Sequence, residues 1–162
     1  EFVSTGSAKP FRESEQDGTS KQDSQEGVEF LVRYQYNRRI KSSKTGQSRS
    51  FCDKMISANK VYRKEDIIAM DNIAVNAGFG VGGSATYSIW KYKGGARCQH
   101  AWLRKTFAKK GGKGLGKAIT TREARSKGFR APVNNQEVPV APANMQYAGY
   151  TAEYWNKMGF KN

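Results

Sequence analysis

The sequence predicts an α+β protein: a small core of short antiparallel strands with two or three short helices, flanked by long extended arms at both ends. Apolar and polar residues alternate over 28–36, as in a half-buried strand. Apolar residues recur at helical spacing in two short segments, 51–58 and 64–70. We therefore expect three parts: a flexible acidic and polar arm over 1–27, the core over 28–108, and a basic Gly-rich linker, short helix and extended arm over 109–162.

The first strand begins at Val28, and Leu31 is the apolar residue on its otherwise polar face. The residues of its apolar face are Val28, Phe30, Val32, Tyr34 and Tyr36. Ser50 is the expected N-cap of the helix over 51–58, because a serine hydroxyl can accept from a free backbone N–H of the first turn. A short extended segment at 61–62 separates this helix from the second one, over 64–70.

The second half of the core is predicted from glycines and aromatics. The segment 78–83 (GFGVGG) is expected to be a loop, and 86–92 (TYSIWKY) a strand, because aromatic and β-branched residues favour strands. A turn at Gly94–Gly95 would pair that strand with another in the later half of 96–107. A short basic helix is expected over 118–127.

Composition restricts the function. The chain has 162 residues, with 28 Lys+Arg against 14 Asp+Glu, so its formal charge is +14. It contains no run of about 18 apolar residues, so we expect no membrane-spanning helix and no membrane partner. Two cysteines and one histidine exclude a disulfide scaffold and leave little for His-based catalysis. We expect a basic protein that binds something negative and is not an enzyme.

Two glycine motifs resemble nucleotide-binding loops. Residues 78–83 match G-x-G-x-x-G, but a dinucleotide site needs a helix at the motif and an acid about 20 residues later, and no acid lies between Asp71 and Glu123. Residues 111–117 come close to a P-loop, but Ala118 stands where the hydroxyl that binds Mg²⁺ is needed. We interpret both segments as ordinary loops.

Cys52, Cys98 and His100 form a candidate metal site. The Cys98-x-His100 spacing places two soft ligands on one side of an extended chain, and folding could bring Cys52 to them. Zinc prefers such ligands, but a structural site needs four, and Asp53 or a water would have to supply the last. Zinc is therefore a candidate cofactor, alongside two alternatives: a Cys52–Cys98 disulfide, and simple packing of the three side chains.

Positive charge is densest between Lys91 and Arg130, which contain 13 Lys and Arg and a single acid, Glu123. Such a stretch suits either the phosphate backbone of DNA or an acidic protein partner. The residues that we expect to bind it are Lys109, Lys110, Lys113, Lys117, Arg122 and Arg125. Aromatics near the C-terminus are expected to anchor the arm on neighbouring subunits: Tyr147, Tyr150, Tyr154, Trp155 and Phe160.

Several short motifs in fixed order resemble a known family. They are Phe51-Cys52, YRKEDI over 62–67, NAGFGVGG over 76–83, YSIWKYKGG over 87–95, and Cys98-x-His100-x-Trp102, followed by ARSKGFRAP over 124–132 and VPVAPANM over 138–145. The chain is similar over about 30–146 to a C-terminal, Cys/His-containing region of head and structural proteins of tailed phages of Bacteroidetes. That region follows prohead-protease-like domains or occurs in portal-associated and minor head proteins.

The resemblance implies a structural component of a phage virion, in the head, portal or neck, that belongs to a symmetric multi-copy assembly. Its partners would be capsid or portal proteins of the same virion, and packaged DNA. It also implies a role for the Cys-x-His element, although minor head proteins tend to carry more Cys and His ligands. The protease part is missing, so no protease activity is expected. The alternatives are a packaged DNA-binding protein without sequence specificity, and a zinc-binding morphogenesis protein.

Overall fold

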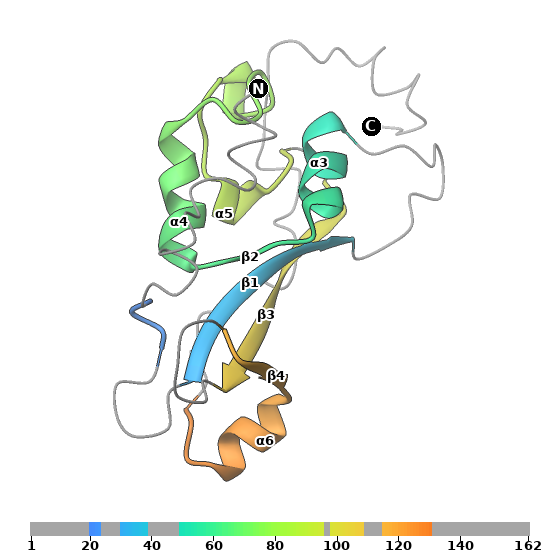
Figure 1. Cartoon of the computed structure of the whole chain (residues 1–162). Helices are drawn as coiled ribbons and strands as arrows, with labels where there is room; N and C mark the ends of the chain where they lie inside the picture. Colours follow the sequence, from blue (N-terminus) through green and yellow to red (C-terminus); the bar gives the residue numbers. More distant parts are fainter. Residues whose placement is uncertain (1–19, 24–29, 39–48, 96–97, 109–114, 131–162) are drawn as a thin grey trace.

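The computed structural model describes residues 20–23, 30–38, 49–95, 98–108 and 115–130. They form one four-stranded antiparallel sheet, in the order β2-β1-β3-β4, and four short α-helices. Figure 1 shows α3, α4 and α5 gathered around one end of the sheet and α6 beside β4 at the other end. The predicted α+β core is therefore confirmed.

Two long strands, β1 (Phe30–Arg38) and β3 (His100–Ala108), form the centre of the sheet. They pair over their whole length, from Phe30 opposite Ala108 to Arg38 opposite His100. The short edge strands are β2 (Val61–Tyr62), which pairs with β1, and β4 (Lys117–Ile119), which pairs with β3. The predicted pairing of 86–92 with the later part of 96–107 is wrong, because β3 pairs with β1 and β4 instead.

The alternating apolar residues of β1 face the core, as the sequence predicts. Its even-numbered apolar residues lie in the core, where Tyr34 packs edge-on against Trp90 and Tyr36 packs edge-on against Trp102. The opposite face is covered too: Leu31 and Arg33 are both buried. Part of that cover is the segment 20–23, whose Asp23 forms an ion pair with Arg33. Four residues of the predicted N-terminal arm thus lie against the core.

The first two helices occur where the sequence predicts them. Helix α3 spans Ser50–Ala58 and buries Phe51, Cys52 and Met55. Its N-cap is Arg49 rather than Ser50, which is the first helical residue, and no side chain caps it. Helix α4 spans Lys64–Ala69 and continues into a 3₁₀ turn over Met70–Asn72.

The segment predicted as a strand over 86–92 contains helix α5 (Ile89–Tyr92) instead. Two side chains start this helix. The Ser88 hydroxyl accepts from Lys91 N–H at 3.2 Å, and the Asp71 carboxylate accepts from Ile89 N–H at 2.6 Å. The second of these caps comes from a distant part of the chain, so β propensity within the segment does not decide its structure.

The basic helix is shorter than predicted. Helix α6 spans Thr121–Ser126, and the first residues of the predicted 118–127 helix belong to β4. Thr120 sets the boundary through a capping box, in which its hydroxyl accepts from Glu123 N–H and the Glu123 carboxylate accepts from Thr120 N–H. Phe129 then packs its ring against Phe30, with centroids 4.9 Å apart, and so joins this end of the chain to β1.

Candidate metal centre

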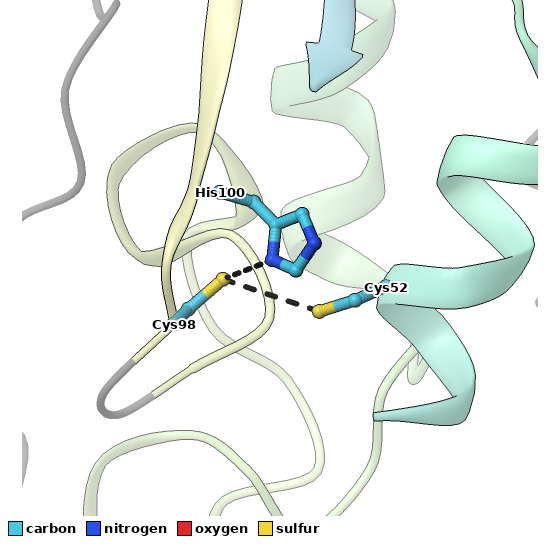
Figure 2. A group of neighbouring side chains, drawn as sticks. All are labelled: Cys52, Cys98 and His100. Atoms are coloured by element: carbon cyan, nitrogen blue, oxygen red, sulfur yellow. Dashed lines mark hydrogen bonds between the residues drawn. The ribbon is translucent and has the colours of Figure 1, made fainter. Parts of the chain in front are cut away.

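Helix α3 and the start of strand β3 bring the candidate ligands together. Cys52 lies in the first turn of α3, Cys98 precedes β3, and His100 is the first residue of β3. Figure 2 shows the two sulfurs and the imidazole ring pointing toward one another. The predicted convergence of Cys52 with Cys98-x-His100 is therefore present in the fold.

The distances fit a compact metal site. The two Sγ atoms are 3.9 Å apart, Cys98 Sγ lies 3.4 Å from His100 Nδ1, and the ligand atoms of the three residues all lie within 4.8 Å of one another. A tetrahedral zinc ion with Zn–S of about 2.3 Å and Zn–N of about 2.0–2.1 Å would set the S–S edge at about 3.8 Å and the S–N edge at about 3.6 Å. The Sγ–Sγ distance and the Cys98 Sγ–His100 Nδ1 distance both lie close to these values.

The turn before β3 is built around the sulfurs. Gly94 N–H donates to Cys98 Sγ at 3.3 Å, and a Cβ at Gly94 would overlap Cys52 Sγ and lie 3.2 Å from Cys98 Sγ. The hydroxyl of Tyr36, on β1, lies 3.4 Å from each sulfur. Glycine at 94 is therefore required by the close approach of the two cysteines.

Further hydrogen bonds hold this turn in place. The Gly94 carbonyl accepts from Asn76 Nδ2 and from Arg49 Nη1, both at 3.1 Å. Asn76 Nδ2 also donates to the Tyr87 hydroxyl, which in turn donates to the Lys93 carbonyl at 2.9 Å. The consecutive carbonyls of Lys93 and Gly94 are thus fixed by side chains, and those of Asn76 and Tyr87 are buried.

The two cysteines differ in acidity. Burial opposes ionisation of Cys98, but hydrogen bonds from Cys52 and His100 outweigh it and lower the pKa of the Cys98 thiol well below its usual value. The pKa of Cys52 is raised well above its usual value, by its hydrogen bond with Cys98 and by burial. Within the pair, one thiol therefore ionises more readily than the other, because each proton or charge is stabilised by the neighbouring sulfur.

The sequence left three other possibilities open at this cluster: a Cys52–Cys98 disulfide, Asp53 as a fourth ligand, and simple packing. Cys52 and Cys98 are both free thiols, so the structure contains no disulfide between them. Asp53 is not the missing ligand, because its side chain is 54% exposed and lies 3.7 Å from Arg38 at the surface. His100 Nε2 is buried and has no hydrogen-bond partner among the described residues. A metal bound at Nδ1 would leave that atom in the same state, so it does not separate simple packing from a metal site.

Sequence reasoning missed Tyr36 and Gly94. The sequence predicts Tyr36 on the apolar face of the first strand and Gly94 in a turn. Both predictions are confirmed, but neither indicates contact with sulfur. The register of β1 and β3 supplies that contact, since it places Tyr36 opposite Trp102, two residues after His100. The sequence carries no direct signal for this register.

The glycine loop is not a phosphate site. The N–H groups of Gly78 and Gly80 both donate to the Ser84 carbonyl, at 3.2 and 3.1 Å, and Gly83 N–H donates to the Gly80 carbonyl. These amides are therefore unavailable to an anion. The P-loop-like segment ends in Lys117, which opens strand β4 rather than a helix.

The predicted basic residues are only partly described. Lys117, Arg122 and Arg125 are exposed on β4 and α6. Lys109, Lys110 and Lys113 lie outside the described residues, as do the aromatics Tyr147, Tyr150, Tyr154, Trp155 and Phe160. Lys93, within the basic stretch, is fully buried, and burial lowers its pKa to about 8.

No family model, curated protein or solved structure matches this chain. Across the described part of the chain, none of the helices has the length and apolar character needed to span a bilayer.

Proposed function

We propose that this protein is a non-enzymatic structural component of a tailed-phage virion, in the head, portal or neck. It would bind neighbouring capsid or portal subunits through its terminal segments and turn a basic surface toward DNA or an acidic partner. The observation that carries this proposal is that the two ends of the fold differ in chemistry. A buried Cys/His cluster lies at the end with α3, and exposed cations lie at the end with β4 and α6. The resemblance of the sequence motifs to those of phage head proteins is what suggests the virion context.

The basic surface consists of five exposed cations: Lys117, Arg122, Arg125, Lys127 and Arg130. The acid among them, Glu123, is engaged by the capping box of α6 through hydrogen bonds of 2.7 and 2.9 Å to Thr120. Exposed Lys and Arg side chains bind phosphates by releasing condensed counterions, without reading sequence. This surface favours DNA binding as the second candidate function.

The virion assignment is tested on purified particles. Mass spectrometry of intact particles should detect this chain in a fixed ratio to the capsid protein, and cross-linking should join residues of 109–162 to capsid or portal subunits. Absence of the chain from particles that package DNA normally would refute the proposal.

DNA binding is tested by a salt titration of the purified chain with duplex DNA. The logarithm of the binding constant should fall with the logarithm of salt by about 0.9 per neutralised phosphate. A double variant Arg122→Ala/Arg125→Ala should reduce that slope by about 2. The matched control is Lys54→Ala, an exposed cation on α3. A slope near zero in the wild type would favour an acidic protein as partner.

The Cys/His cluster would hold a structural zinc ion. Two cysteine sulfurs and an imidazole are the donor set that zinc prefers, and burial of all three side chains fits a structural site rather than a catalytic one. Bound there, zinc would join α3 to the start of β3. The protein purified under reducing conditions should contain about one zinc per chain. Cys52→Ser and Cys98→Ser should lose it, and Ser57→Ala, an exposed position on α3, should retain it.

A further inference from the structure

The cluster provides three ligands, and a structural zinc site takes four. Within the described residues, the ligand set of Cys, His, Asp and Glu at this place is Cys52, Cys98 and His100 alone. The neighbouring Asp53 faces solvent. The fourth ligand must therefore be a side chain of another type, a water molecule, or a group outside the described residues.

Tyr36 places its hydroxyl oxygen beside both cysteine sulfurs. Its hydroxyl oxygen lies 3.4 Å from Cys52 Sγ and 3.4 Å from Cys98 Sγ. A tetrahedral centre with Zn–S of about 2.3 Å and Zn–O of about 2.0–2.2 Å has S–O edges of about 3.6 Å. A phenol carries one proton, so it can donate to only one sulfur at a time. The second sulfur can lie equally close either by donating its own thiol proton to the phenol oxygen or by sharing a metal with it, and the cobalt experiment below separates the two.

The ring of Tyr36 is held firmly in this orientation. It stacks on His100, with centroids 5.1 Å apart and an interplanar angle of 15°, and it meets Phe51 and Trp102 edge-on. Each of these neighbours comes from α3 or β3, the elements that the metal would join. The oxygen is thus preorganised beside the sulfurs, which is a general requirement of a good metal site.

Solvent reaches the cluster poorly. The exposed fractions are 3% for Tyr36, 1% for Cys52, 6% for Cys98 and 5% for His100. A catalytic zinc keeps an open position for water, whereas a structural one is closed by protein. The sealed surroundings favour a protein oxygen over an exchangeable water.

We propose that the hydroxyl oxygen of Tyr36 is the fourth metal ligand, giving a Cys₂-His-Tyr centre built from β1, α3 and β3. This inference rests on the metal site of the proposed function. As the bonds to the metal form, the phenol proton of Tyr36 and the thiol protons of the cysteines leave to the buffer. The metal then joins three elements of the core rather than two.

Cobalt(II) in place of zinc tests the inference, because its visible spectrum reports coordination. The wild type should bind Co²⁺ with thiolate charge-transfer bands and a four-coordinate ligand-field spectrum that added imidazole does not change. Tyr36→Phe keeps the ring stacking and both thiolates. It should bind Co²⁺ about 10–100-fold more weakly, with a spectrum that shifts on adding imidazole. The control is Tyr34→Phe, which removes a buried hydroxyl from the same face of β1 and should match the wild type.

The outcomes separate the two proposals. If the wild type binds no cobalt or zinc, the metal site itself is refuted, and the role of Tyr36 with it. If the wild type binds cobalt but its spectrum responds to imidazole, or Tyr36→Phe behaves as the wild type does, Tyr36 is not a ligand and the zinc site stands without it. The imidazole response of the wild type alone decides the question if Tyr36→Phe does not fold.

Discussion

The carboxylate of Asp23 lies 2.9 Å from the guanidinium of Arg33, and their side chains are only 5% and 2% exposed. The same carboxylate accepts from the backbone N–H of Val32 at 2.6 Å and from that of Ser20 at 2.8 Å. Arg33 would otherwise be a charged side chain buried on the second face of β1. The short segment 20–23 is therefore part of the folded core and neutralises a charge that the strand brings inside.

Removal of this carboxylate should be costly. Asp23→Asn removes the charge that pairs with the buried Arg33 guanidinium, and we expect a loss of about 3–5 kcal/mol in the free energy of unfolding, measured by urea denaturation. The matched change Asp53→Asn affects an exposed pair with Arg38 and should cost less than about 1 kcal/mol. Equal effects of the two substitutions would show that segment 20–23 adds nothing to stability.

Gly94→Ala tests the close approach of the two cysteines. The added methyl would overlap Cys52 Sγ, so we expect at least a 10-fold loss of zinc affinity and a stability cost of about 1–3 kcal/mol. Gly82→Ala is the control, because nothing lies within 4 Å of its Cβ. Its positive φ of 65° should cost about 1–2 kcal/mol and leave zinc affinity unchanged. Unchanged zinc binding in Gly94→Ala would contradict the close packing of Gly94 against the two cysteine sulfurs.

Glu65 should make stability depend on pH. Burial opposes ionisation of this carboxylate, but hydrogen bonds from its own backbone N–H, Lys21 N–H and the Ser20 hydroxyl outweigh it and lower its pKa. A carboxyl whose folded pKa lies below its unfolded value contributes stability above the unfolded value. That contribution is lost as pH falls through the folded one.

The measurement is the urea midpoint at several pH values. Glu65→Gln should be less stable than the wild type at pH 7, and the difference should shrink as the solution becomes more acidic than about pH 4. Ser20→Ala removes one of the donors and should show a smaller difference of the same sign. A difference that grows toward low pH would refute this assignment.

The capping box of α6 makes a separate prediction. Thr120→Ala removes the hydroxyl that accepts from Glu123 N–H at 3.1 Å, and we expect a loss of about 1 kcal/mol, seen as a lower thermal midpoint. Thr120→Ser should restore most of it. The neighbouring Thr121→Ala, at an exposed helical position, should be neutral or slightly stabilising.

The sequence predicted the elements whose pattern is local. Strand β1, the short β2 and helices α3 and α4 all follow from alternation or helical spacing within a few residues. The errors arose where distant residues decide. Helix α5 depends on the Asp71 carboxylate, and the partner of β3 depends on a register that no local pattern encodes. The start of α6 could have been predicted from the sequence, since Thr120-x-x-Glu123 is a capping-box pattern.

The sequence likewise predicted only part of the candidate site. Residue type alone pointed to Cys52, Cys98 and His100, because these are the soft ligands of the chain. Tyr36 and Gly94 were beyond sequence reasoning. A tyrosine on an apolar strand face and a glycine in a turn have ordinary explanations, and only the three-dimensional arrangement shows that both lie against sulfur.

During synthesis, β1 leaves the ribosome well before β3. About 60 residues separate Arg38 from His100, the facing pair closest in sequence, which corresponds to about 3–12 s of translation at roughly 5–20 residues per second. Throughout that interval one edge of β1 is not paired with β3, and Cys52 has been synthesised before Cys98 and His100. The β1–β3 pairing and the Cys52–Cys98–His100 cluster can therefore form only after β3 has emerged, and a nascent chain stalled before β3 would expose an open strand edge to chaperones.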